Sequence, residues 1–306
     1  MTSVITVDGL AKSYGSVEAV TDVSFSVECG EIFGILGPNG AGKTTTVECL
    51  QGLRHRDGGE VRVLDLDPDR QPDELRRRIG SQLQSSALPD RLRVGEAVRL
   101  FAGLQSVPVD VEQTLASWGL REVRRRPFAA LSGGQRQRLF LALALLGEPE
   151  VVFLDELTTG LDPQARRTAW DLVRSVRDRG ATVVLVTHLM EEAEALCNRV
   201  AVVDNGSVVA LDRPRRLTAE LGGAVEVTFS SNGTAPALVD DLFGGLPGVA
   251  SWQLSDGLVT ICAESSGVVD IAAALAAHDL HPDDFATKRP SLEDVFLALT
   301  GRTLRD

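Results

Sequence analysis

Three short runs rich in apolar residues lie near the start of the chain, over residues 4–7, 23–27 and 32–36, and they alternate with turn residues. These runs are rich in valine, isoleucine, phenylalanine and threonine, and turns are expected at Gly9 and Gly15 between them. Runs of branched and aromatic residues that are bounded by turn residues are typical of β-strands. The pattern therefore predicts a β-rich segment at the N-terminus.

Farther along, from residue 89 to 146, the apolar residues recur every three or four positions, which is the spacing of helices. Two wholly apolar runs follow at 151–154 and 182–186, with a helical stretch over 163–178 between them. Such runs are typical of buried parallel strands that are joined by a helix. The pattern predicts a βαβ unit inside an α/β domain.

A proline at residue 214 breaks this pattern, and a glycine pair at residues 222 and 223 follows it. A chain of 306 residues is also long for a single hydrophobic core. We therefore expect a first domain over residues 1–221 and a smaller second domain over residues 222–306.

The second domain is expected to mix strands and helices. Its β-like runs cover residues 225–229 and 258–262, and its helical stretches cover 268–277 and 292–299. The last helix is bounded by clear signals. Pro290 precedes it, Ser291 and Asp294 form a capping-box pattern, and Gly301 follows it.

The chain is acidic, with a formal net charge of −12. A surface of this sign repels phosphate backbones, so we expect no nucleic-acid partner. The four cysteines are scattered without a C-x-x-C pair, which indicates a reducing compartment and no cysteine metal site. The first residues have no basic or long apolar region, and the longest apolar run, 139–146, is far shorter than the ~20 residues of a membrane span. We therefore expect a cytoplasmic chain whose membrane role depends on a partner.

A phosphate-binding loop is predicted directly after the run at 32–36. Residues 37–44 match the pattern G-x-x-x-x-G-K-[ST] between a predicted strand and a predicted helix. In such a loop the backbone N–H groups surround the phosphates, Lys43 adds a positive charge, and the Thr44 hydroxyl can ligate Mg²⁺. The residues of the loop are Gly37, Pro38, Asn39, Gly40, Ala41, Gly42, Lys43 and Thr44.

A second predicted anion site opens the helix that follows residue 132. Ser132 and the N–H groups of Gly133 and Gly134 can bind an anion at the N-terminus of this helix. An ordinary helix cap would explain Ser132, but it would not explain two glycines followed by Gln135.

The buried run at 151–154 ends in two adjacent acids, Asp155 and Glu156. Buried strands seldom end in paired carboxylates unless these handle a cation or a proton. We therefore expect this strand end to belong to the same phosphate site.

With these motifs the sequence resembles the ATP-binding-cassette ATPases over residues 4 to about 215. Residues 131–135 match their signature motif, while 37–44 and 151–155 match their two nucleotide motifs. The resemblance implies an α/β fold, that of a P-loop NTPase with an antiparallel β subdomain and a helical subdomain over about 85–147. A small α+β C-terminal domain would follow. It also implies ATP and Mg²⁺ as cofactors.

The resemblance assigns Asp155 to Mg²⁺ through water and Glu156 to polarising the attacking water. Neighbouring residues at a strand end can address different sides of one phosphate, which fits this division. The expected ATP-binding residues outside the loop are Thr45, Ser132, Gly133, Gly134 and Gln135.

Three further residues match the family pattern. Tyr14, the only tyrosine, lies where the family stacks an aromatic ring on adenine, and His188 resembles the histidine that senses the γ-phosphate. Gln82 and Gln84 share one strand face, so periodicity does not choose between them. The family spacing selects Gln84 for contact with Mg²⁺ and water.

Residues 160–163 resemble the loop that passes between paired subunits, where Asp162 reaches toward the opposite nucleotide. The same residues also form a helix-starting turn with Pro163 at the first position. Leu157 stands where many family members have proline. This difference removes no catalytic group.

In this family ATP lies between the phosphate loop of one chain and the signature motif of another. The resemblance therefore implies a homodimer, or a dimer with a related ATPase, docked on a separate transmembrane permease at the inner face of the cell membrane. Residues 289–302 and 154–162 resemble the daunorubicin-resistance exporters, which favours multidrug or antibiotic export. The alternative is a non-transport ABC ATPase of translation or DNA repair. Such proteins usually carry two cassettes or long insertions, which this chain lacks.

Overall fold

The computed structural model describes residues 2–82, 88–159, 161–220, 225–231, 240, 242–264 and 266–301. These residues fall into two compact units that meet in the chain between Pro214 and Arg215. The boundary expected at residues 221 and 222 lies outside the described residues. Each unit is described by itself below.

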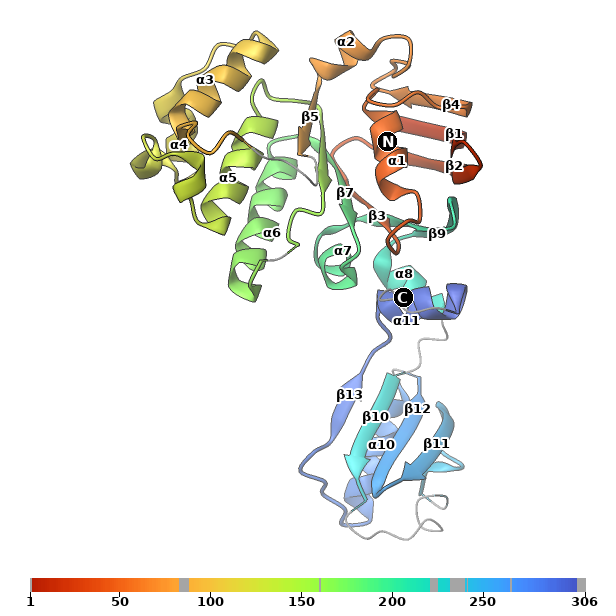
Figure 1. Ribbon diagram of the computed structural model, residues 1–306. Coiled ribbons are helices and arrows are strands. Elements are labelled where there is room, and N and C mark those ends of the chain that lie inside the picture. Colours follow the sequence, from red (N-terminus) through yellow and green to blue (C-terminus); the bar gives the residue numbers. More distant parts are fainter. Residues whose placement is uncertain are drawn as a thin grey trace. The chain divides into compact units, whose positions relative to one another are not determined.

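A nine-stranded sheet forms the centre of the first unit (Figure 1). Its two ends differ, because β1, β2 and β4 pair antiparallel, whereas β3, β5, β6, β7 and β8 pair parallel. In the order of pairing the strands are β4 (Gly58–Val63), β1 (Ser3–Tyr14), β2 (Val17–Glu28), β9 (Ser207–Asp212), β8 (Arg199–Asp204), β3 (Ile32–Leu36), β7 (Thr182–Thr187), β6 (Val151–Asp155) and β5 (Ile79–Gln82).

The parallel part of the sheet is buried on both faces. Along β6, Val151 and Phe153 pack into one hydrophobic core, and Val152 and Leu154 pack into the other. Burial on both faces explains why this stretch is apolar without a break. The predicted βαβ unit is confirmed, since β6 and β7 pair in parallel and the helix α6 joins them.

The N-terminal strands are longer than predicted. We expected a turn at Gly9, but Gly9 lies inside β1, where the pairing with β2 shifts register between Val7 and Leu10. Its φ of 59° is in the left-handed region that glycine adopts readily. A glycine that forms a bulge and a glycine that forms a turn give the same sequence signal, which is why this prediction was wrong. The turn at Gly15 is confirmed, between β1 and β2.

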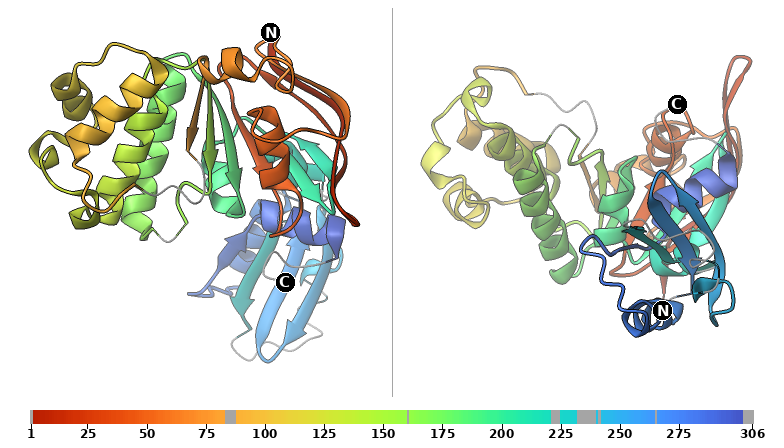
Figure 2. Two further views of the ribbon diagram at one scale, coloured as in Figure 1. Left: turned by 45° about the horizontal axis from the view of Figure 1, so that its top comes forward. Right: turned by 90° about the horizontal axis from the view of Figure 1, so that it is seen from below.

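Helices flank the sheet of the first unit, and Figure 2 shows α3, α4 and α5 grouped on the side away from β1, β2 and β4. This group confirms the predicted helical segment after residue 89. The helices of the unit are α1 (Lys43–Leu50), α2 (Pro72–Arg76), α3 (Val94–Gln105), α4 (Val111–Ser117), α5 (Gly133–Ala144), α6 (Pro163–Asp178) and α7 (Met190–Leu196), with 3₁₀ turns at Arg121–Val123 and Phe128–Ala130.

The second unit has its own four-stranded antiparallel sheet, of which the sequence predicted two strands. Apolar side chains of β10 and β12 pack with Ile271 and Leu275 of α10 into a separate core. The strands, in order of pairing, are β11 (Val249–Ser255), β12 (Leu258–Ala263), β10 (Val225–Ser230) and β13 (Ala286–Lys288), and the helices are α8 (Pro214–Glu220), α10 (Gly267–Ala277) and α11 (Leu292–Thr300).

The predicted boundaries of the last helix are confirmed. The Ser291 hydroxyl accepts a hydrogen bond from the Asp294 backbone, and the Asp294 carboxylate accepts one from the Ser291 backbone at 2.8 Å. Gly301 ends the helix with a φ of 68°. The missed strand β13 is three exposed residues long, so it carries no hydrophobic pattern to detect.

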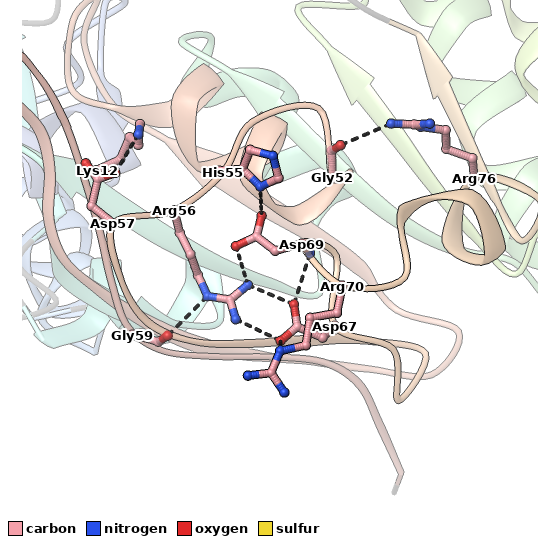
Figure 3. A network of polar contacts seen from close by, with 10 residues as sticks. All are labelled: Lys12, Gly52, His55, Arg56, Asp57, Gly59, Asp67, Asp69, Arg70 and Arg76. Atoms are coloured by element: carbon pink, nitrogen blue, oxygen red, sulfur yellow. Dashed lines mark hydrogen bonds and ion pairs between the residues drawn. The ribbon is translucent and has the colours of Figure 1, made fainter.

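A polar network fastens the loop after α1 to the turn after β4 (Figure 3). Arg56 donates two hydrogen bonds to the Asp67 carboxylate, at 3.0 and 2.9 Å, and a third to Asp69 at 2.9 Å. It also donates to the Gly59 carbonyl oxygen at 3.1 Å. These bonds to Arg56 are the main reason that the pKa of Asp67 falls to about 2. A bidentate arginine–carboxylate pair, such as that of Arg56 and Asp67, is among the stronger polar contacts in proteins.

We predict that Arg56→Ala lowers the free energy of unfolding by about 2 kcal/mol at neutral pH. The pKa of Asp67 lies below its ordinary value of 3.8, so the contribution is full above about pH 4 and is lost as the pH falls toward 2. The deficit of the variant should therefore shrink in acid. Denaturant unfolding at several pH values measures it.

Arg70→Ala is the matched control, because the Arg70 side chain is 82% exposed and its Nε lies 3.8 Å from the same carboxylate. An exposed pair of this kind adds little stability, so no measurable loss is expected. Equal losses in the two variants would contradict the assignment.

Candidate nucleotide-binding and hydrolysis site

Three neighbouring parallel strands bring the predicted motifs to one edge of the sheet. The phosphate loop follows β3, His188 follows β7, and Glu156 follows β6. In register, Leu36 at the end of β3 pairs with Thr187 on β7, and Val186 pairs with Asp155 on β6. The carboxyl ends of parallel strands share one edge, and ligands of α/β sheets bind there.

The phosphate loop has a backbone that only glycine can adopt at two positions. Gly42 has a φ of 98°, and a Cβ there would lie 2.3 Å from the Ala19 carbonyl oxygen. Gly37 has a φ of 154°, and a Cβ there would lie 2.1 Å from the Val203 carbonyl oxygen. The loop then enters α1 at Lys43, so the N-terminus of this helix faces the phosphate position. Of the other loop residues, Ala41 is buried and Asn39 and Gly40 are exposed.

Lys43 is held inside the curve of this loop. Its Nζ donates hydrogen bonds to the carbonyl oxygens of Gly37 and Pro38, each at 2.8 Å. Burial lowers the pKa of Lys43, and the negative charges of Glu156 and Asp155 oppose this shift. The positive charge of the loop and the two acids after β6 are therefore parts of one electrostatic unit.

Asp155 fits the role of a cation ligand. Burial, followed by repulsion from Glu156, raises the pKa of Asp155 to about 6, and a hydrogen bond from the Thr44 hydroxyl works against this rise. Its Oδ1 atom is buried and has no hydrogen-bond partner among the described residues. A buried, unpaired carboxylate oxygen beside a threonine hydroxyl is a donor set that Mg²⁺ prefers. Gln84, the third predicted ligand, lies outside the described residues.

Glu156 and His188 meet directly. The Nδ1 atom of His188 lies 3.2 Å from Oε1 of Glu156, a distance at which the ring donates a hydrogen bond when Nδ1 carries the proton. Glu156 has a φ of 50°, which is unusual for a residue with a side chain, and its backbone N–H donates to the Val186 carbonyl oxygen at 2.9 Å. Strained backbone of this kind is concentrated at functional sites.

The signature residues form the N-terminus of α5. Ser132 is its cap: the Gln135 backbone donates to the Ser132 hydroxyl at 3.3 Å, and the Ser132 backbone donates to the Gln135 side chain at 3.1 Å. This capping box gives Gln135 a structural role, so a helix cap explains Gln135 as well as Ser132. Ser132 and Gly133 remain exposed at the surface.

Asp162 caps α6 in the same manner, accepting hydrogen bonds from the backbone of Gln164 and Ala165 at 3.0 and 2.9 Å. The starts of α5 and α6 face each other across a cavity of about 330 Å³ lined by Gly134, Arg138, Asp162 and Ala165, among others. The predicted signature motif and the predicted loop at Asp162 therefore line the same cavity. Gly160 lies outside the described residues.

Tyr14 lies at the end of β1, and two cations lie close to its ring. The guanidinium carbon of Arg54 is 5.0 Å from the centre of the ring, and Nζ of Lys12 is 5.7 Å from it. Neither neighbour was predicted from the sequence. The period of a strand places Lys12 and Tyr14 on one face, so a signal for Lys12 was present, whereas none pointed to Arg54.

These features define a P-loop NTPase whose phosphate loop, acid pair and histidine share one sheet edge. Comparison with known proteins makes the class specific. A family model described as ABC transporter matches residues 20–159. The daunorubicin resistance ATP-binding protein DrrA3 of Streptomyces coeruleorubidus is 40% identical, with 97% of this chain and 96% of that protein covered. The Nod factor export ATP-binding protein I of Ralstonia nicotianae is 37% identical, with 100% and 96% covered.

Solved structures show the same fold. An ATP-binding subunit of an ABC transporter superposes with a TM-score of 0.64 at 27% identity, covering 72% of this chain and 93% of that one. An ATP-binding cassette solved as a dimer in a post-hydrolysis state with ADP and Pi gives 0.62 at 27% identity, covering 68% and 98%. The chain belongs to the ATP-binding subunits of ABC transporters, in the group that includes the daunorubicin-resistance and the Nod factor export ATP-binding proteins. It is an ATPase.

We predict that Glu156→Gln slows ATP hydrolysis by about 10² to 10⁴-fold and leaves ATP binding intact, because it removes the carboxylate that we expect to orient water and spares the phosphate loop. Steady-state turnover and the Kd for ATP separate the two effects. Glu191→Gln is the matched control, since the Glu191 side chain is 74% exposed on α7. Wild-type turnover in Glu156→Gln would contradict the role of this residue.

Proposed function

We propose that the chain powers the export of a drug, an antibiotic or another hydrophobic compound through a separate membrane permease, at the inner face of the cell membrane. The observation that carries this proposal is the full-length similarity to ATP-binding proteins named for daunorubicin resistance and for Nod factor export. The non-transport alternative in translation or DNA repair is not favoured by these relatives. None of the described helices is long and apolar enough to cross a membrane.

The hydrolysis step uses the charges at the sheet edge. Lys43, Thr44 and Thr45 hold the β- and γ-phosphates together with the loop N–H groups, and Tyr14 stacks on adenine. Thr44, and Asp155 through water, would hold Mg²⁺, with Gln84 as a further contact, and the bound ion would neutralise phosphate charge. Glu156 orients the attacking water, and His188, 3.2 Å from it, senses the γ-phosphate.

The working unit is a dimer, either of two copies or with a related ATPase. The exposed Ser132 and Gly133, with Gly134 and Gln135, contact ATP held by the other chain, and Asp162 lies at the same interface. The dimeric relative with ADP and Pi supports this arrangement. Residues 222–306 would form an accessory domain, in keeping with the separate sheet and core of their described part.

Export can be tested in the host that encodes the chain, with daunorubicin as a fluorescent probe. Deleting the gene should raise the accumulation of daunorubicin, and the wild-type chain should reverse this rise. Glu156→Gln should not reverse it, because transport requires the energy of hydrolysis. Complementation by Glu156→Gln equal to that by the wild type would contradict a role in powering export.

A second experiment tests the dimer. Lys43→Ala and Ser132→Arg should each abolish stable binding of ATP between two chains. A mixture of the two should recover it, because the mixed dimer contains one composite site in which both residues are intact. Sedimentation with ATP measures the dimer, and each single variant is a control for the mixture. A mixture that forms no more ATP-dependent dimer than the single variants would contradict the two-chain site.

A further inference from the structure

A buried carboxyl group lies behind the site and is not part of any nucleotide motif. Glu192, on α7, has no exposed surface. Its Oε1 atom accepts a hydrogen bond from the Thr158 hydroxyl at 2.8 Å and another from the indole Nε1 of Trp170 at 3.1 Å. Both donors are themselves buried. One oxygen atom therefore joins three segments of the first unit.

Each of these segments leads to a group proposed to act on ATP. Thr158 lies two residues after Glu156, and α7 begins two residues after His188. Trp170 lies on α6, whose N-terminal cap is Asp162. The Thr187 hydroxyl, directly before His188, also acts on the Glu192 carboxyl and lowers its pKa. Glu192 is thus tied to both sides of the contact between Glu156 and His188.

The buried position of this carboxyl group carries a desolvation cost. Burial raises the pKa of Glu192 above its ordinary value, and the hydrogen bonds from Thr187, Thr158 and Trp170 only partly offset this rise. An acid whose pKa is higher in the folded chain than in the unfolded chain lowers stability at pH values above its ordinary pKa, which is 4.5 for Glu192. A group kept at such a cost is expected to serve function.

Glu156 needs support of this kind. Its φ of 50° persists only if the surrounding contacts fix it, and its backbone bond to Val186 is one such contact. The hydrogen bond from Thr158 to Glu192 is a second contact that holds the same turn. Without it, the turn could relax and move the Glu156 carboxylate away from the water and from His188.

We infer that Glu192 is a positioning residue for ATP hydrolysis, which holds the turn after Glu156 and the helix after His188 in one fixed arrangement through Thr158 and Trp170. It touches no substrate, and it acts through Glu156 and His188. The inference rests on the ATPase activity and is independent of what is transported.

The test removes the donors one at a time in the full-length chain. Thr158→Val keeps the shape of the side chain and loses the hydroxyl, and Trp170→Phe keeps an aromatic ring, of smaller volume, and loses the indole N–H. In each we expect kcat for ATP hydrolysis to fall about tenfold, with KM for ATP unchanged, because misplaced catalytic groups slow the chemical step. Thr182→Val is the matched control: Thr182 is also buried and accepts a hydrogen bond from Gly30 at the far end of β7. Its kcat should stay at the wild-type value.

Two substitutions of Glu192 sharpen the test. Glu192→Gln keeps an oxygen acceptor for both donors and should retain turnover, whereas Glu192→Leu should lose it. Combining Thr158→Val with Glu192→Leu should lower kcat no further than the more severe of the two single substitutions. The reason is that Glu192→Leu already removes the hydrogen bond that Thr158→Val removes. If Glu192→Leu does not fold, the kcat and KM values of Thr158→Val and Trp170→Phe still test the inference. The inference is overturned if both turn over like the wild type, if kcat and KM change together, or if Glu192→Gln is as impaired as Glu192→Leu.

Discussion

The parallel pairing of β3, β7 and β6 is the constraint on which the rest of the site depends. Because these strands are neighbours and run in one direction, the loops that leave them share one edge of the sheet. Segments more than a hundred residues apart in the chain, such as Lys43 and Glu156, act on each other there. A slip of one residue between β6 and β7 would turn every side chain of β6 to the opposite core. The apolar packing on both faces therefore protects the chemistry at the end of the strand.

The buried charges of the site also partly neutralise one another. A buried lysine and two neighbouring acids would each be costly alone, yet together they moderate one another. Burial still leaves the pKa of Asp155 at about 6, so the pair of acids carries unrelieved repulsion. A bound cation would relieve it, which is why this strand end is suited to Mg²⁺ and costly to keep without it.

Much of this architecture could be predicted from the sequence, and the failures have physical reasons. The helix expected at 163–178 has the same bounds as α6, because its start is marked by a cap and a proline. By contrast, β11 alternates small polar and half-buried residues, and its signal was too weak to detect. The spacing of Ser132 and Gln135 matches a capping box, so this role of Gln135 could have been predicted from the sequence. Gln135 was instead assigned only to ATP binding. Contacts across the fold, such as that between Thr158 and Glu192, have no sequence period and required the structure.

The capping box at the start of α5 has a consequence for how two chains would meet. The Ser132 hydroxyl and the Gln135 amide are already bonded to the backbone of their own helix, and the glycines between them are fixed in its first turn. This surface would therefore already have its bound conformation before a second chain contacts it. The loss of conformational entropy would be borne when each chain folds and not when the pair closes. Closure would then be limited by the movement of whole domains, and could be repeated in every cycle without local refolding.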